Sequence, residues 1–369
     1  MTAFRVSPGS LLAFAALSLI VACGVCRADE EKVLNVYNWS DYITEQALAD
    51  FTARTGIKVN YDVYDSNEVL DAKLLTGNSG YDVVFPSATP YLARQILAGA
   101  YQKLDRSALS NYARIDPKVL AQMQVADPSN EYGVPYMMAG TGVGYNVDKV
   151  KAAAPDAPIG SLAMLFDTAV LEKLQGCGVS VLDSPEEVFS AALAYLGLDP
   201  NSTEQAHLDK ATELLSAARP YYRYIHSSSY INDLANGATC VAMGYAGDLV
   251  QARERAREAG NGVVIDIFLP REGAAFNIDV MAIPVDAPHP GNAHAFIDHL
   301  LTPEVIGSIS SAVGYANAVP ASREYMDEAM RKDPAVNPPA EIELYSFKLM
   351  DSNFERQRSR AWNRVKTRR

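Results

Sequence analysis

The sequence predicts an α/β protein built on parallel sheets. Patterns typical of strands and helices alternate along residues 33–100, and this βαβα order favours parallel strands joined by helices. Apolar residues make up 49% of the chain and charged residues 21%, which is typical of a globular protein with a sizeable core. The length of 369 residues predicts one very large domain or two domains of ordinary size.

The first third of the chain carries the clearest periodicities. Alternating apolar and polar residues predict strands, and apolar residues three or four apart predict helices. Gly77 and Gly80 mark one helix end, and Ser87 is expected to cap the helix that follows Pro86. The predicted strands are 33–37, 56–66 and 81–86; the predicted helices are 45–55, 67–80 and 87–100, with helical structure expected to begin near residues 39–42.

From about Pro135 the chain changes character. Residues 134–150 form a long extended stretch interrupted by glycines, which predicts a connection leaving one sheet and entering another. The basic C-terminus has apolar residues at Phe354, Ala361, Trp362 and Val365, so we expect a solvated helix with one apolar face. The other expected elements are helices at 185–215, a strand, turn and helix start at 239–249, two strands at 261–284, helices from residue 294 and a proline-rich connector at 334–345.

The N-terminus has the pattern of a secretory signal peptide. Arg5 precedes an apolar run at 11–22, which is followed by small residues. Two processing routes are open: a lipoprotein with Cys23 as its acylated first residue, or cleavage after Ala28 to release an exported soluble protein. We favour the soluble form, because the segment from Cys23 to Ala28 is short for a tether. Either route predicts a protein that works outside the cytoplasm.

The soluble route leaves two cysteines, Cys177 and Cys240. Two cysteines in an exported protein favour one disulfide, and two buried thiols are the alternative. No C-x-x-C spacing remains, so neither thiol redox chemistry nor a thiolate metal site is expected.

Several classes of function are excluded or disfavoured. The net charge of −12 argues against nucleic acid and anionic membranes as partners. The glycines of GTGVGYN (140–146) do not have dinucleotide-binding spacing, and the chain has no P-loop, G-x-S-x-G or H-E-x-x-H motif. We therefore expect no cofactor, no metal and no catalytic nucleophile.

Acids and aromatic residues gather where predicted strands end. Each one alone is compatible with a structural role; Asp248, for example, could simply cap a helix. Together they suit a cation, because aromatic faces and carboxylates both attract positive charge, and ligands bind at the carboxyl ends of strands in open α/β sheets. The residues concerned are Trp39, Ser40, Asp41 and Tyr42, then Ser87, Thr89, Glu186, Glu187, Tyr245, Asp248, Asp279 and Tyr315.

Long stretches of the chain resemble one known family. They include VYNWSDYI, DVYDSNEVLDAKL, YDVVFPSA, CGVSVLDSPEEVFSAALAYLG, HSSSYINDLANG and GYAGD. The chain resembles the periplasmic polyamine-binding proteins of bacterial ABC importers, and most of all their putrescine-binding members. The resemblance implies a type II periplasmic-binding-protein fold, with two α/β lobes joined by hinge strands and a ligand in the cleft between them. It implies no enzyme activity, and we expect a monomer that delivers its ligand to a membrane permease.

After a leader at 1–28, the implied lobe 1 is 29–135 with 268–322, and lobe 2 is 136–267 with 323–369. Asp248 and Asp279 are implied to pair with the ammonium ends of the ligand, so acidification should weaken binding. The resemblance also implies a disulfide between Cys177 and Cys240, in agreement with the argument from compartment. The family's pocket falls on Trp39, Ser40, Asp41, Tyr42, Ser87, Glu187, Asp248, Asp279 and Tyr315.

Two positions depart from the family pattern. The family usually has Trp where this chain has Tyr245, and an aromatic residue where it has Asn277. Both changes bear on the ligand, so agmatine or spermidine stand beside putrescine as expected ligands. Other readings are a ferric-iron receptor that uses the many tyrosines, an exported enzyme acting on amines, and a receptor kept for sensing or adhesion after losing polyamine binding.

Overall fold

The computed structural model describes residues 1–3, 30–339 and 341–367. The predicted leader, both cleavage positions and Cys23 lie outside the described residues, apart from residues 1–3. In the described part of the chain, no helix has both the length and the apolar character needed to cross a membrane. The body that begins at Lys32 is described below.

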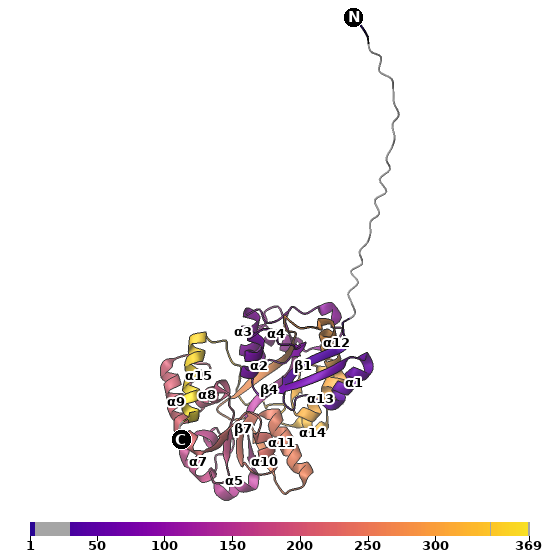
Figure 1. Cartoon of the computed structure of the whole chain (residues 1–369). Helices are drawn as coiled ribbons and strands as arrows, with labels where there is room; N and C mark the ends of the chain where they lie inside the picture. Colours follow the sequence, from indigo (N-terminus) through magenta and orange to yellow (C-terminus); the bar gives the residue numbers. More distant parts are fainter. Residues whose placement is uncertain (4–29, 340, 368–369) are drawn as a thin grey trace. The chain divides into compact units, whose positions relative to one another are not determined.

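The predicted α/β class is confirmed. Eleven strands belong to one curled sheet, with a main path in the order β2-β1-β3-β9-β4-β7-β5-β6. The strands at each end of this path are parallel, as expected for βα units. Two long strands at its centre, β4 (Gly133–Asn146) and β9 (Ala274–Ala282), run antiparallel to each other. Figure 1 shows β4 passing between two groups of helices.

The first half of the body, residues 32–132 and 283–325, surrounds β1, β2 and β3. Its strands are β1 (Val33–Trp39), β2 (Lys58–Tyr64), β3 (Val83–Val84) and β10 (Ala316–Asn317). Its helices are α1 (Glu45–Thr55), α2 (Asn67–Leu75), α3 (Ala93–Leu97), α4 (Pro117–Met123), α12 (Pro290–Leu300) and α13 (Pro303–Val313), with short turns of helix at Ala88–Leu92, Arg106–Ala108, Tyr112–Arg114 and Pro320–Tyr325.

The second half, residues 147–268 and 341–367, surrounds β5, β6 and β7. Its strands are β5 (Val179–Val181), β6 (Tyr222–Ile225), β7 (Val241–Tyr245), β8 (Ile265–Phe268) and β11 (Leu344–Tyr345). Its helices are α5 (Val147–Ala153), α6 (Ala163–Phe166), α7 (Thr168–Leu174), α8 (Pro185–Tyr195), α9 (Gln205–Ala218), α10 (Tyr230–Ala235), α11 (Ala246–Ala259) and α15 (Ser352–Thr367), with a short turn at Arg219–Tyr221; α14 (Glu328–Lys332) follows the first half in sequence.

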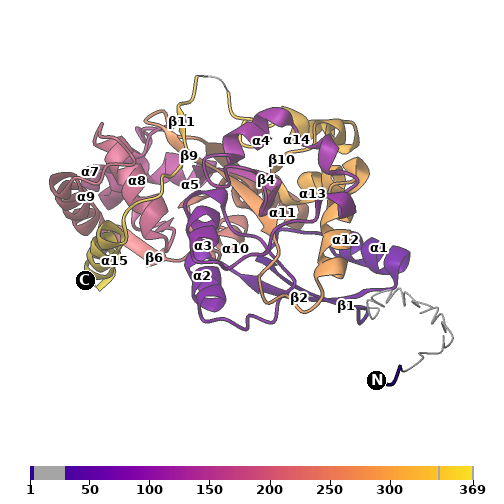
Figure 2. The ribbon, with the colours of Figure 1, turned by 90° about the horizontal axis from the view of Figure 1, so that it is seen from above.

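Each half has its own hydrophobic core. Leu34 and Phe51 are fully buried in the first half, and Leu174 and Phe189 are buried in the second. The view from above separates α1 and α12 on one side from α7, α8 and α9 on the other (Figure 2). The first half also contains a second buried cluster, which includes Leu70 and Leu92. The cores of the two halves are joined through β4 and β9, which leaves the junction between them free to hold a pocket.

The predicted C-terminal helix is present as α15, and its apolar face packs on the second half. Phe354, Ala361, Trp362 and Val365 are all buried. The helix is less solvated than expected, because Arg358 is also buried and lies 3.3 Å from the Glu186 carboxylate.

Two local predictions differ from the structure. Helical structure does not begin at residues 39–42, because Asp41 has a φ of 55° and Thr44 caps α1, which begins at Glu45. Ser87 does precede a helical turn, but its side chain makes no capping hydrogen bond. Its hydroxyl is used in the pocket instead, as described below.

The predicted disulfide between Cys177 and Cys240 is confirmed, with a Cα–Cα distance of 5.5 Å. It joins the loop after α7 to the start of β7, so it ties two neighbouring segments of the second half together. The two cysteines are 63 residues apart in sequence, which makes the closed loop long.

We expect the double substitution Cys177→Ser and Cys240→Ser to lower the free energy of unfolding by about 2–5 kcal/mol, because the cross-link restricts the unfolded chain. Urea unfolding measures this loss. Reduction of the wild-type protein should produce the same shift, and reduction should leave the double variant unchanged. Equal stability of oxidised wild type and variant would contradict the prediction.

Candidate functional site

A pocket lies between the two halves, at the carboxyl ends of parallel strands from both. It encloses about 730 Å³ of space not filled by atoms, part of which is open to solvent. Side chains that follow β1 and β3 line it from the first half, and side chains that follow β5, β6 and β7 line it from the second. Ten of the predicted residues line this pocket: Trp39, Ser40, Tyr42, Ser87, Glu187, Tyr245, Asp248, Asn277, Asp279 and Tyr315.

Trp39 ends β1 and forms an aromatic wall. Its indole N–H donates to the Phe85 carbonyl at 2.8 Å, which fixes the ring. The Tyr64 ring lies 4.8 Å away, and the Tyr245 ring from the second half meets Trp39 edge-on at 6.0 Å. The wall therefore includes side chains from both halves.

Asp279 is a buried carboxylate held by two hydroxyl groups. Ser87 donates to one carboxylate oxygen at 2.6 Å and Tyr42 donates to the other at 2.7 Å. Burial raises the pKa of Asp279 to about 6, although both hydrogen bonds act to lower it. The negative charge is therefore costly in this place, even with both donors present.

Asp248 has the same arrangement on the opposite half. It lies in the first turn of α11, where the helix dipole favours an acid. Tyr230 donates to one oxygen at 2.6 Å and Tyr315 to the other at 2.8 Å. Burial raises the pKa of Asp248 to about 6, against the lowering effect of the two hydroxyls. Because Tyr315 comes from the first half, the Asp248 site draws on both halves.

Both glycines of the GYAGD stretch allow the two tyrosines to reach Asp248. A Cβ on Gly244 would lie 2.4 Å from the Tyr230 ring, and one on Gly247 would lie 2.1 Å from the Tyr315 ring. No real Cβ makes contacts this short, so any larger residue must displace the tyrosine. The two glycines therefore contribute to the site by leaving room for the Tyr230 and Tyr315 rings beside Asp248.

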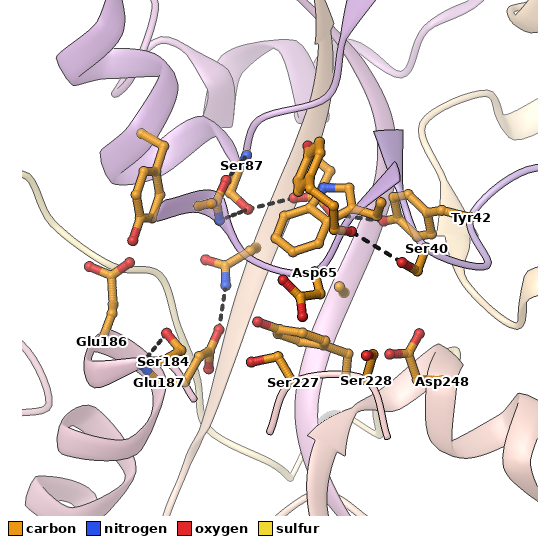
Figure 3. A pocket seen from close by; sticks show the side chains of 18 of the residues that line it. Ser40, Tyr42, Asp65, Ser87, Ser184, Glu186, Glu187, Ser227, Ser228 and Asp248 are labelled. Carbon is orange, nitrogen blue, oxygen red and sulfur yellow. Dashed lines mark hydrogen bonds between the residues drawn. The ribbon is translucent and has the colours of Figure 1, made fainter. Parts of the chain in front are cut away.

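Glu187 lies in the first turn of α8, after the N-cap residue Ser184. The Thr141 hydroxyl donates to one of its oxygens at 2.8 Å, and the Asn277 amide donates to the other at 3.4 Å. Burial raises the pKa of Glu187 to about 8, and nearby carboxylates add to the effect. Figure 3 shows Glu187 and Asp248 on opposite sides of the pocket, with Asp65, Ser227 and Ser228 between them.

Asp41 is the one predicted site residue that does not line the pocket. Its side chain is exposed and forms an ion pair with Arg255 of α11 at 2.9 Å. The backbone of Asp41 also accepts a hydrogen bond from Gln251 at 3.2 Å. The residue therefore joins the two halves outside the pocket.

Sequence reasoning missed several lining residues. Some lie in stretches that carried the family resemblance, namely DVYDSNEVLDAKL and HSSSYINDLANG, so their position in those stretches was the available signal. Phe347 had none, because it follows an irregular connector. The missed residues with polar or aromatic side chains are Tyr64, Asp65, Asn67, Glu68, Tyr91, Ser184, Ser227, Ser228 and Phe347; Thr89 and Glu186, both noted at strand ends in the sequence, also line the pocket.

Comparison with known proteins agrees with this geometry. The model of a family described as bacterial extracellular solute-binding proteins matches residues 46–338. The chain belongs to this family. Its members capture solutes and are not enzymes, in agreement with the expectation from sequence.

Curated relatives of this solute-binding protein align over nearly its whole length. The putrescine-binding periplasmic protein PotF of Escherichia coli is 49% identical over 92% of this chain and 93% of its own. The putrescine-binding periplasmic protein SpuD of Pseudomonas aeruginosa is 48% identical over 93% and 94%. A putrescine/agmatine-binding protein of P. aeruginosa is 40% identical over 95% and 98%.

Solved structures confirm the predicted type II fold of this solute-binding protein. The spermidine/putrescine ABC transporter substrate-binding protein PotD of Streptococcus pneumoniae has a TM-score of 0.73 and 25% identity, and covers 91% of this chain and 99% of its own. The TpPotD lipoprotein of Treponema pallidum has a TM-score of 0.74 and 27% identity, and covers 90% and 99%.

We expect Gly247→Ala to destabilise the protein by about 1–3 kcal/mol through overpacking against Tyr315, although Ala is normally the better helix former. Thermal or urea unfolding measures the loss. In a Tyr315→Ala background the same substitution should be neutral or stabilising, because the clash is gone. A similar loss in both backgrounds would contradict the role assigned to Gly247.

We expect Asp279→Asn to change how stability depends on pH. Burial raises the folded-state pKa of Asp279 to about 6, so the folded protein favours the protonated carboxyl group. The stability that this group contributes is therefore full below about pH 4 and is lost as the pH rises through 6. The asparagine variant lacks this loss, which is on the order of 3 kcal/mol at 1.4 kcal/mol per pKa unit. Unfolding of ligand-free protein at pH 4.5 and 8 should therefore favour the variant at the higher pH; parallel pH profiles would refute it.

Proposed function

We propose that this protein captures a protonated diamine or polyamine of the putrescine class in the pocket between its halves and delivers it to an ABC permease. The observation that carries the proposal is the set of three buried carboxylates, Asp248, Asp279 and Glu187, whose side-chain hydrogen-bond partners within the described part of the chain are all neutral donors. The relatives named for putrescine, agmatine and spermidine support it.

The electrostatics explain why a cation is the expected ligand. Desolvation is the largest cause of the raised pKa of all three carboxylates, which means that the surrounding protein groups do not fully compensate their charge. A buried charge becomes favourable only when it is paired and hydrogen-bonded. An ammonium group supplies both the charge and up to three donors, and each charge-assisted hydrogen bond contributes about 1.5–3 kcal/mol.

The aromatic side chains would contact the aliphatic part of the ligand, between its cationic ends. Trp39 and Tyr245 offer ring faces and edges that can cover methylene groups, at about 0.8 kcal/mol for each CH₂ removed from water. Tyr42 and Tyr315 meet edge-on at 4.9 Å, and each holds one of the two aspartates. A short aliphatic chain with a cationic group at each end fits this pattern of apolar walls between acidic ends.

We further propose that the two halves correspond to the lobes of a closing receptor. The lobe boundaries expected from the sequence are 29–135 with 268–322 and 136–267 with 323–369, and they differ from the halves by a few residues at 268 and 323–325 and by the assignment of β4 and β9, which pass between the halves. Contacts that join the halves support closure on the ligand: Tyr315 with Asp248, and Arg255 with Asp41. β4 and β9 pass between the halves and would supply the hinge.

The place of action proposed for the protein is the periplasm. The relatives named as periplasmic proteins and the single disulfide both suit that compartment. Export would use the leader at 1–28, with acylation of Cys23 as the alternative route. A monomer suits a receptor that must dock on a permease and release its ligand.

Calorimetric titration of ligand-stripped protein with putrescine tests the proposal, and we expect one-to-one binding in the micromolar range or tighter. Asp248→Asn should weaken it at least a hundredfold, since one charged partner is lost. The affinity should fall as the pH is lowered through about 6, because Asp248 and Asp279 take up protons while the ligand keeps its charge.

Arg356→Ala is a matched control for these titrations, since Arg356 is exposed on α15 and is absent from the pocket lining. Its affinity should equal that of the wild type. No binding of putrescine, cadaverine, agmatine or spermidine by the folded protein would refute the proposed function.

A further inference from the structure

The Glu187 end of the pocket differs chemically from the Asp248 end. Both oxygens of Asp248 accept strong hydrogen bonds from tyrosine hydroxyls, at 2.6 and 2.8 Å. At Glu187 one of the two bonds is long, since the Asn277 amide lies 3.4 Å from the carboxylate. Room for further hydrogen bonds therefore remains at the Glu187 end.

Asn277 leaves an acceptor without a donor at this end. Its side chain is 8% exposed, and its Oδ1 accepts no hydrogen bond from the described residues. Asn277 and Asp279 are two residues apart on β9, so both point to the same face, and both line the pocket. A buried acceptor left unpaired costs about 1–3 kcal/mol. A donor group from the ligand would remove this cost.

The acids beyond Glu187 differ from it in having arginines nearby, although burial still raises the pKa of Glu186 to about 7. Glu186 lies 3.3 Å from the Arg358 guanidinium, and both side chains are buried. Burial raises the pKa of Glu68, and the nearby Arg358 and Arg94 oppose this effect. A third ammonium group in that direction would meet the positive charge of Arg358, which already forms an ion pair with Glu186. This disfavours a triamine and favours a ligand whose second end stops at Glu187.

We propose that Glu187 and Asn277 together bind a guanidinium group. The preferred ligand is then a guanidine that carries an aminoalkyl chain of four carbons, as in agmatine, with its ammonium group at Asp248. This inference rests on the function proposed above and specifies one end of the ligand. A guanidinium presents five N–H donors in a planar fork, which can reach Glu187 and the free Oδ1 of Asn277 together.

The hydration of the two cations also favours a guanidinium over an ammonium group at the Glu187 end. An ammonium group is a compact and strongly hydrated charge, whereas a guanidinium is more weakly hydrated and loses less when it is buried. Glu187 is buried, and its neighbours Thr141 and Asn277 are buried as well. The dry end of the pocket therefore suits the cation that is easier to dehydrate.

Titration of ligand-stripped protein with agmatine and putrescine tests the inference, because these ligands differ only in one end group. We expect agmatine to bind at least tenfold more tightly than putrescine. Asn277→Leu, which keeps a similar shape without polar atoms, should weaken agmatine at least tenfold and putrescine less than threefold. Asn277→Ala should show the same selective loss if the leucine does not fit, and thermal unfolding reports whether each variant is folded.

Asp248→Asn provides the matched comparison at the opposite end, and it should weaken both ligands by the same factor. Putrescine binding as tight as or tighter than agmatine, or an equal loss of both ligands in Asn277→Leu, would overturn the inference and leave the proposed function standing. Tighter binding of spermidine than of agmatine would also overturn it. No binding of any of these amines would overturn the inference and the proposed function together.

Discussion

The cost of burying several carboxylates together governs this structure. Asp248, Asp279 and Glu187 are removed from water, and burial raises the pKa of each one. Oriented hydroxyl groups of tyrosine, serine and threonine side chains offset part of this cost by donating hydrogen bonds to the carboxylates. Neutral donors hold the acids in place without cancelling their charge. The pocket is thus prepared for a cation and remains unfavourable without one.

Much of the fold could be predicted because its signals are local. The strand and helix patterns of residues 33–100 require only a period of two or of three to four, and the structure has β1, α1, β2, α2 and β3 in that order. The boundary after β1 could not be predicted, since Asp41 adopts a left-handed conformation and its surroundings are distant in sequence: the neighbouring Ser40 N–H donates to the Tyr64 carbonyl, and Gln251 of α11 donates to the Asp41 carbonyl. The burial of Arg358 was missed for a similar reason: its partner Glu186 is distant in sequence.

The candidate site likewise contains residues that could be predicted from sequence and residues that could not. Asp248 and Glu187 follow strands directly and occupy the first turns of helices, so their position could be inferred from sequence order. Ser87 illustrates the limit of that reasoning, because the hydroxyl expected to cap a helix donates to Asp279 instead. Tyr230, which holds Asp248, gave no separate signal, since its role depends on a close approach to Gly244 that only the folded chain reveals.

The hydrogen bond from Tyr315 to Asp248 joins residues on the two halves of the body. If the halves separate as proposed, Asp248 loses this donor at the same moment as the ligand loses its enclosure. Opening would therefore weaken ligand binding more than exposure of the pocket to solvent would by itself. A membrane partner that pulls the halves apart would in this way promote release without touching the ligand, and the residence time of the captured amine would depend on the contacts that join the halves, this tyrosine contact among them.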